Sequence, residues 1–198
     1  MRHCILALNF AVLVGLSCTG AQAPQKEVPQ PTIPFEDVGA CPFECCTYRA
    51  WTVEKPTALR SDRVSTAPIV ASLLPNSVVT AVTGVVVTEK AGIARVRATF
   101  EISDAFTKSR IVFNPGDTIF LLHYEGEGLW LCWFHGERVS LGFLDTPGSF
   151  ASDGEIKNQP TQVKSWPEVQ WWIKIKTQDG IEGWTAESAH FAHKDACE

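Results

Sequence analysis

The stretch that most constrains the fold of this chain is the run Trp171–Trp184. Asp179-Gly180, near its centre, is typical of a two-residue hairpin turn. Before the turn, Trp171–Lys176 alternates between a largely apolar face and a face that carries two lysines, which is the period of a half-buried strand. After the turn, Gly183 allows close approach of another strand, and Trp184 supplies a large ring for a core. The run predicts the closing hairpin of a small β-barrel.

The rest of the chain predicts further short strands. A long β-branched run, Ser77–Thr88, bends at Gly84, and Asn114–Asp117 is a strong turn sequence. No segment shows a helical period over three turns. Residues 145–166 are polar and contain prolines and glycines, which predicts a long surface loop. We therefore expect an all-β fold.

The N-terminus has the pattern of a targeting segment. Arg2 and His3 precede the apolar run Cys4–Leu16, which is too short to span a bilayer comfortably. We expect residues 1–21 to be a signal peptide. Alternatively, Leu16-Ser17-Cys18 resembles a bacterial lipobox, so that a lipoprotein signal would end before Cys18 and this cysteine would carry the lipid. Either interpretation predicts export, to the periplasm or the outer face of the membrane, or secretion.

Residues 22–40 form a polar, proline-rich linker that predicts an extended spacer instead of a folded element. The mature chain then keeps five cysteines in an oxidising compartment, where disulfides persist: Cys41, Cys45, Cys46, Cys132 and Cys197. We favour the pairs Cys41–Cys46 and Cys45–Cys197, because the second would join both ends of the domain. Four cysteines allow three pairings, and spacing does not choose among them. We interpret Cys132 as a buried free thiol, and a zinc site lacks the usual ligand spacing.

Three strands and the closing hairpin together resemble a bacterial SH3-like domain. The strands are Thr57–Arg60, Ile69–Leu73 and Val78–Gly84, and the resemblance covers about residues 51–84 and 171–191. In a simple domain of this family, Gly84 would run almost directly into the tryptophan pair.

The resemblance therefore implies a discontinuous SH3-like barrel formed by residues 41–88 and 167–198, with residues 89–166 inserted. The insert contains Pro115–Leu122 and Trp130–Gly136, which look like pieces of a second, degenerate SH3-like barrel. We expect two small barrels packed together. The alternative is a single barrel extended by extra strands.

The sequence favours a protein without catalytic activity. A formal net charge of −5 gives no basic surface for nucleic acid, and the only membrane attachment we expect is a lipid anchor at the N-terminus. Cys132 and His135 would face opposite sides of a strand, and His190 and His193 lack a third metal ligand at definite spacing. We therefore predict no enzyme activity, no metal and no cofactor.

Aromatic residues are the remaining candidates for a binding site. Seven tryptophans exceed what a modest core usually absorbs, and aromatic grooves are how SH3-like folds hold extended peptides. We name Trp171, Tyr124, Trp130 and Glu127 as candidate ligand-binding residues, with the three rings partly exposed. Burial of these rings between the two barrels is the alternative.

By the resemblance, the expected function is an exported binding module of the bacterial cell envelope. Its ligand would be peptidoglycan or an envelope protein or peptide. The alternatives are a structural or accessory envelope protein with no groove ligand, and a protein associated with a cell-wall hydrolase.

Overall fold

The computed structural model describes residues 28–103, 110–143 and 151–197. The fold is all-β, so this prediction is confirmed. The predicted signal peptide, Cys18 and residues 22–27 of the predicted linker lie outside the described residues. Within the described ranges, no helix is both long enough and apolar enough to cross a membrane.

The first sheet is strongly curled and has eight strands, which come from two separate parts of the chain. Seven of them lie in the order β15-β2-β5-β13-β14-β3-β4, and β1 pairs with β5 outside this order. Their bounds are β1 Phe35–Val38, β2 Ala50–Val53, β3 Thr57–Arg60, β4 Ile69–Leu73, β5 Val78–Lys90, β13 Glu168–Lys176, β14 Glu182–Thr185 and β15 Phe191–Ala192.

The second sheet has five strands, and all of them come from the segment between β5 and β13. Their order is β11-β10-β9-β6-β12, with bounds β6 Gly92–Val96, β9 Thr118–Gly126, β10 Leu129–Phe134, β11 Glu137–Gly142 and β12 Thr161–Ser165. A separate hairpin pairs β7 Phe100–Ser103 with β8 Arg110–Phe113. The described helices are α1 Asp153–Asn158 and the 3-10 helix η1 Ser188–His190.

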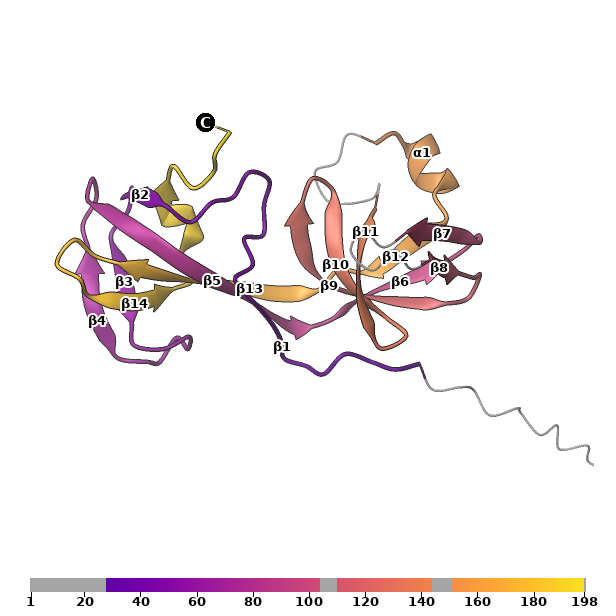
Figure 1. The fold of residues 1–198 in the computed structure, drawn as a ribbon, viewed down its shortest axis with the longest axis horizontal. Coiled ribbons are helices and arrows are strands. Elements are labelled where there is room, and N and C mark those ends of the chain that lie inside the picture. The colour runs from indigo at the N-terminus through magenta and orange to yellow at the C-terminus, as the bar shows by residue number, and fades with distance from the viewer. Residues whose placement is uncertain (1–27, 104–109, 144–150, 198) are drawn as a thin grey trace, which may run out of the picture.

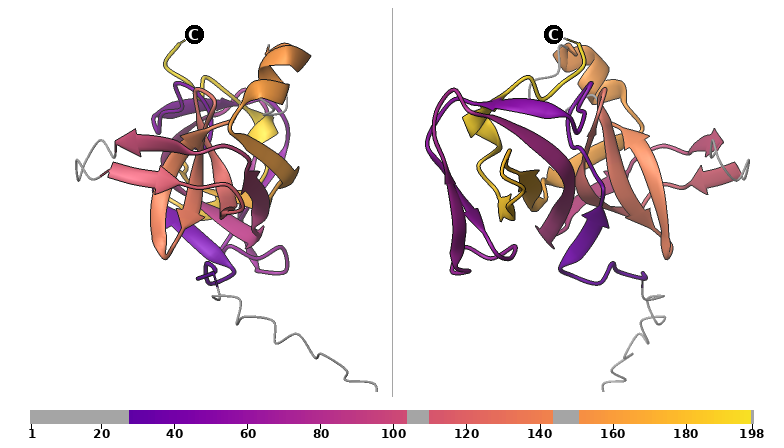
Figure 2. Two further views of the ribbon diagram at one scale, coloured as in Figure 1. Left: turned by 90° about the vertical axis from the view of Figure 1, so that its right-hand side faces the viewer. Right: turned by 60° about the vertical axis from the view of Figure 1, so that its left-hand side comes forward.

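The two sheets form two lobes that are joined by the long strands β5 and β13 (Figure 1). These strands pair with each other from Glu168 opposite Lys90 to Lys176 opposite Thr80. Figure 2 shows that the β7–β8 hairpin projects from the second lobe. The chain therefore leaves the first lobe along β5, builds the second lobe, and returns along β13.

Each lobe has its own apolar core, because inward-facing residues alternate along its strands. The core of the first lobe consists of Trp51, Val53, Leu59, Leu73, Val79, Ala81, Ile173, Ile175 and Phe191. The core of the second lobe consists of Ala94, Val96, Phe113, Ile119, Leu121, Trp130, Cys132, Phe134, Val139, Leu141 and Phe143. A smaller cluster of Val85, Val87 and Trp172 lies along the connecting strands.

Part of the predicted spacer is folded, which differs from the sequence expectation. We call residues 28–40 the N-terminal strap, and its strand β1 pairs with β5 over four residues. Glu36 forms an ion pair with Arg63 of the first lobe at 2.9 Å. Asp37 Oδ2 lies 2.9 Å from Nε2 of His123, a second-lobe residue that is only 2% exposed. The strap is ordered because β5 takes up its backbone hydrogen bonds and because its two carboxylates find partners in different lobes.

The predicted loop 145–166 also differs from the structure, because it contains α1 and β12. Ser152 Oγ accepts a hydrogen bond from the backbone N–H of Glu155, and the Glu155 carboxylate accepts one from the backbone N–H of Ser152. This reciprocal capping box is recognisable from Ser-x-x-Glu alone. The sequence therefore contained a signal for the start of a helix. We did not predict this helix because it is too short to show a helical period over three turns.

The closing hairpin forms where predicted, but its turn is one residue longer. The Thr177 N–H donates to the Ile181 carbonyl at 2.9 Å, and the Gly180 N–H donates to the Thr177 carbonyl at 3.1 Å. Three residues therefore lie between the paired positions, and Gly180 has a φ of 89°. A type I turn followed by a left-handed glycine is the usual three-residue hairpin connection.

Candidate functional site

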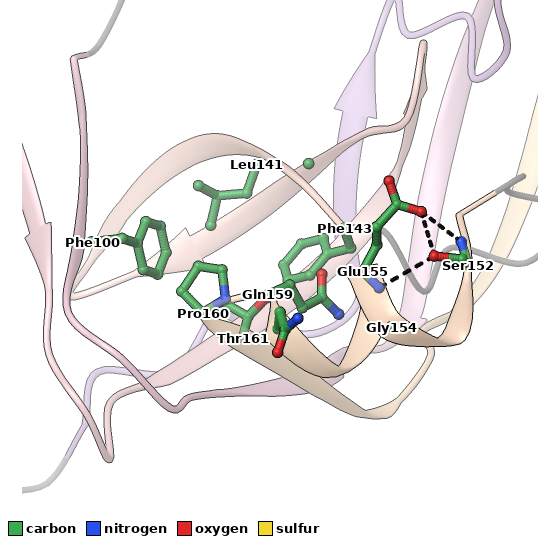
Figure 3. A pocket seen from close by; sticks show the side chains of 11 residues that line it. Phe100, Leu141, Phe143, Ser152, Gly154, Glu155, Gln159, Pro160 and Thr161 are labelled. Atoms are coloured by element: carbon green, nitrogen blue, oxygen red, sulfur yellow. Dashed lines mark hydrogen bonds between the residues drawn. The ribbon is translucent and has the colours of Figure 1, made fainter.

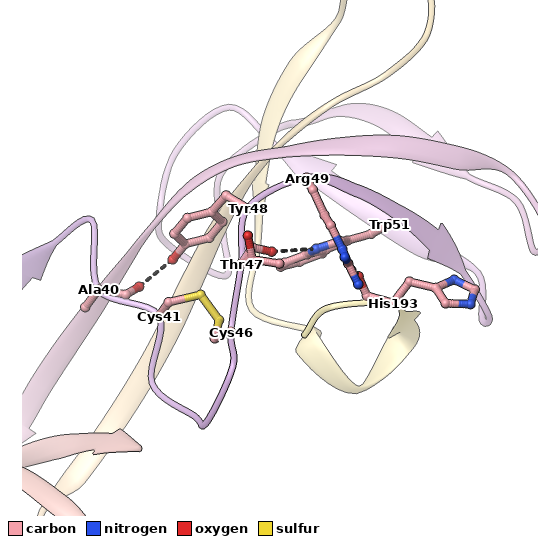
Figure 4. Close-up of a disulfide and its surroundings, with 8 residues drawn as sticks. All are labelled: Ala40, Cys41, Cys46, Thr47, Tyr48, Arg49, Trp51 and His193. Atoms are coloured by element: carbon pink, nitrogen blue, oxygen red, sulfur yellow. Dashed lines mark hydrogen bonds between the residues drawn. A yellow bond between two sulfur atoms is a disulfide. The ribbon is translucent and has the colours of Figure 1, made fainter. Parts of the chain in front are cut away.

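Two disulfides lie at the ends of the first lobe, one of them local and the other joining both ends. Cys41 is bonded to Cys46, and Cys45 is bonded to Cys197, which are the pairs favoured above. Close to the first bond, the Tyr48 hydroxyl donates to the Ala40 carbonyl (Figure 4). The Cys45–Cys197 bond attaches the C-terminal segment to the loop that follows the N-terminal strap.

Beside these disulfides lies an aromatic cluster of Phe43, Tyr48, Trp51 and Trp171. The Trp171 ring is half-buried, with centroid distances of 5.7 Å to Phe43, 6.5 Å to Tyr48 and 6.1 Å to Trp51. Gly84 closes the cluster from β5, because a Cβ at this position would overlap the Tyr48 hydroxyl and the Trp171 indole nitrogen. Trp171 is therefore partly exposed, as expected, and it packs against other rings.

The other three predicted binding residues lie at the β9–β10 hairpin of the second lobe. Trp130 is only 9% exposed, with ring centroid distances of 5.5 Å to Tyr124 and 4.7 Å to Trp166. The Tyr124 hydroxyl accepts a hydrogen bond from the Gly128 N–H at 2.9 Å, and Glu127 is exposed in the turn with a φ of 53°. The expected exposure of Trp130 is thus corrected, because the inserted segment has a core of its own.

The β9–β10 turn touches the disulfide loop. A Cβ on Gly126 would lie 3.1 Å from both the Glu44 nitrogen and the Phe43 carbonyl carbon. Trp171, which packs on Phe43, therefore lies on one side of this contact between the lobes. The other three predicted residues lie on the other side, in the β9–β10 hairpin. None of them lines either of the two cavities described next.

The first cavity, which we call the polar pocket, belongs to the first lobe and has a volume of about 300 Å³. Its walls come from β3, the loop after it, β13 and the segment that leads into η1. The lining residues are Pro56, Thr57, Ala58, Arg60, Ser65, Gln170, Trp172, Thr185, Ala186, Glu187 and His190.

Hydrogen bonds orient the imidazole of the polar pocket. The Thr57 hydroxyl donates a hydrogen bond to the Lys55 carbonyl at 2.9 Å. Its oxygen then acts as the acceptor towards His190 Nδ1, which lies 3.0 Å away. This assigns the proton to Nδ1 of His190. The opposite nitrogen, Nε2, lies 3.6 Å from Glu187 Oε2.

A guanidinium and an indole complete the polar pocket. Arg60 Nη1 donates to the Ala67 carbonyl at 2.9 Å, which holds the cation at the wall. Trp172 is 4% exposed and packs on Val85 and Val87 of β5, so these contacts hold its ring in place. The pocket thus combines an apolar ring with groups of both charges, as specific ligand sites commonly do.

The second cavity, which we call the apolar cleft, belongs to the second lobe and has a volume of about 640 Å³ (Figure 3). Apolar side chains of β7, β11 and the segment after α1 form much of its wall, and α1 borders it. The lining residues are Phe100, Leu141, Gly142, Phe143, Ser152, Gly154, Glu155, Asn158, Gln159, Pro160 and Thr161.

Cys132 is not an activated nucleophile. Cys132, which we expected to be a buried free thiol, is fully buried and forms no disulfide. Burial raises its thiol pKa well above the ordinary value, and the nearby Glu125 charge raises it further, so it stays protonated and inert. Among the described residues, no group of three or more histidines, cysteines or carboxylates could hold a metal ion.

Comparisons with known proteins add no candidate ligand. No protein-family model, curated protein or solved structure matches the chain. The two cavities are therefore the features that bear most directly on function.

Proposed function

We propose that the protein is an exported, non-catalytic binding protein of the bacterial cell envelope, and that its polar pocket holds a short charged peptide of the kind peptidoglycan carries. The observation that carries this proposal is the arrangement of Arg60, Glu187 and His190 around the buried Trp172. The two disulfides support export, because such bonds persist in oxidising compartments. The resemblance to SH3-like domains supports an envelope ligand.

The charges of the pocket suit a zwitterionic peptide. Arg60 offers planar guanidinium donors for a carboxylate, and Glu187 offers an acceptor for an ammonium group. His190 is held in one orientation by Thr57, so it presents Nε2 without a rotational cost. Peptidoglycan stem peptides contain free carboxylates and can contain free amines, and these groups match both charges.

The same geometry argues against catalysis in this pocket. A nucleophile needs a base within hydrogen-bond reach, but the Thr57 hydroxyl already donates its hydrogen bond to a backbone carbonyl. Cys132 is sealed in the core of the second lobe. Binding without bond cleavage is the function that these contacts favour.

Co-sedimentation of the oxidised mature protein with purified peptidoglycan sacculi tests the proposal. Gln170 and Gln178 offer a matched pair, because both are exposed residues of the same hairpin region but only Gln170 lines the pocket. We expect the wild type and Gln178→Trp to sediment with sacculi. We expect Gln170→Trp, which fills the pocket, to remain in the supernatant with an unchanged circular dichroism spectrum.

Three other outcomes contradict parts of the proposal. A folded wild type that stays in the supernatant excludes the cell wall as the ligand and leaves envelope proteins to be tested. Loss of binding in Trp171→Ala, with Gln170→Trp still bound, moves the site to the aromatic cluster. Release of soluble fragments from sacculi by the wild type contradicts the non-catalytic assignment.

A further inference from the structure

We propose a second ligand site in the apolar cleft of the second lobe, which takes an amphiphilic small molecule with an apolar body and a cationic head group. The site is independent of the polar pocket, because the two cavities lie in different lobes and share no lining residue. Eleven of the described residues line this site. The volume of about 640 Å³ is within the range of sites that hold drug-sized ligands.

The cleft is preformed by rigid apolar walls. The Phe100 ring stacks on Phe113 with a centroid distance of 4.5 Å and an interplanar angle of 3°. Leu141 and Phe143 are 5% and 3% exposed, so the core holds them in place. Pro160 is held through its carbonyl, which accepts from two backbone N–H groups at 2.7 and 3.2 Å. The protein would therefore lose little conformational entropy when a ligand enters the cleft.

The remaining wall sets the charge of the ligand. Of the described residues that line the cleft, Glu155 alone is charged. Its Oε2 accepts from both the Ser152 N–H and the Ser152 hydroxyl, at 2.8 and 2.6 Å. These hydrogen bonds hold the pKa of Glu155 below its ordinary value, so the carboxylate is ionised at neutral pH. No hydrogen bond or ion pair among the described residues uses Oε1.

Charge complementarity therefore selects the head group. Among the residues that the structure describes, no lysine, arginine or histidine lines the cleft, so the charged group that an anionic head group would meet there is the Glu155 carboxylate. A cationic head group can pair with Oε1 while the apolar body covers Phe100, Leu141 and Phe143 (Figure 3). The buried Thr161 also lines the cleft, and a few polar groups are common in mostly apolar ligand sites.

Three ligands with one ten-carbon chain and different charges test the proposal: decyltrimethylammonium, decanol and decyl sulfate. The neutral dye N-phenyl-1-naphthylamine reports occupancy of the cleft by its fluorescence. The two ionic ligands are titrated against it below their micelle concentrations, and decanol is titrated below its solubility limit. We expect decyltrimethylammonium to displace the dye from the oxidised mature protein at a concentration at least about tenfold lower than decyl sulfate, since one favourable charge contact amounts to about that factor. Decanol should fall between them.

Variants of α1 and its neighbours separate the cleft from nonspecific binding. Glu155→Gln removes the charge but keeps the capping box, because glutamine also serves at this position. In Glu155→Gln, the concentrations of decyltrimethylammonium and decyl sulfate that displace the dye should differ by no more than about threefold. The matched change Asp153→Asn, at a residue outside the lining, should preserve the preference for the cation. Asn158→Trp, which fills the cleft, should abolish dye binding, and Gln178→Trp should leave it unchanged.

Two results would overturn the inference. One is equal displacement by decyl sulfate and decyltrimethylammonium in the wild type, which would exclude a charge-selective site. The other is unchanged dye binding in a folded Asn158→Trp protein, which would place the dye elsewhere. Near-ultraviolet circular dichroism of each variant establishes that its tertiary structure is intact, and sacculus binding by these variants tests the polar pocket separately.

Discussion

Removing the Cys45–Cys197 disulfide should destabilise the protein far more than removing Cys41–Cys46. The bonds close loops with sequence separations of 152 and 5 residues, respectively. In the chain-entropy description, a disulfide stabilises the fold by limiting the unfolded chain, by about 5 kcal/mol for the long loop and about 2 kcal/mol for the short one at 25 °C. Because whole domains are stable by only about 5–15 kcal/mol, the long-range bond contributes a large share.

Urea unfolding of two paired variants measures this difference. One variant carries Cys45→Ala with Cys197→Ala, and the other carries Cys41→Ala with Cys46→Ala, so neither leaves an unpaired thiol at these sites. Tryptophan fluorescence reports unfolding, because four of the rings lie in the cores or the aromatic cluster. With a slope of about 2 kcal/mol per molar urea, the midpoint should fall by about 2.5 M in the first variant and about 1 M in the second.

The decisive result is which of the two paired variants loses more stability. Equal losses, or a larger loss in the Cys41 and Cys46 variant, would refute the loop-length reasoning. The short bond would then act mainly through native contacts around the aromatic cluster. Reduction of the wild type with dithiothreitol is the control, and its midpoint should fall below that of either variant.

Three further predictions concern packing, pH and the N-terminal strap. Gly84→Ala should lower stability by about 1–3 kcal/mol in thermal unfolding, because its methyl group overlaps the aromatic cluster. Gly142→Ala, whose Cβ meets nothing closer than 3.8 Å, should change stability little. The raised pKa of Cys132 means that the folded state holds its proton more tightly than the unfolded state does. The contribution of this thiol to the free energy of unfolding is therefore complete below about pH 8.5 and should be lost as pH rises further. Cys132→Ala should reduce this alkaline loss in urea titrations, and a wild type equally stable at pH 7 and pH 10 would contradict the assignment. Asp37→Asn should increase amide hydrogen exchange in residues 35–38 because His123 loses its charged partner, and unchanged exchange would show that the β1–β5 pairing alone holds the strap.

Local patterns predicted the elements of the fold better than their ends. The alternation in Trp171–Lys176 matches β13, and the turn at Asp179-Gly180 connects β13 to β14. The turn length was wrong by one residue, because the type of turn depends on how Thr177 pairs with Ile181. The helix α1 was missed, although its capping box was present in the sequence.

The cavities had no comparable signal in the sequence. The polar pocket joins residues as distant as Thr57 and His190, and the apolar cleft joins Phe100 to Thr161. Such groups become neighbours only through pairing between distant strands. Trp130 illustrates the same limit, because a strand period shows which residues share a face but does not show what covers that face.

The sequence by itself determined the all-β class, because a period of two and frequent turn residues are local properties of the chain. It also limited the disulfides to three pairings of four cysteines. Only the tertiary structure decided which rings are buried, where the cavities lie, and that the strap joins both lobes. These features depend on contacts between segments far apart in the chain, such as Asp37 with His123, and burial is a property of the whole assembly of strands.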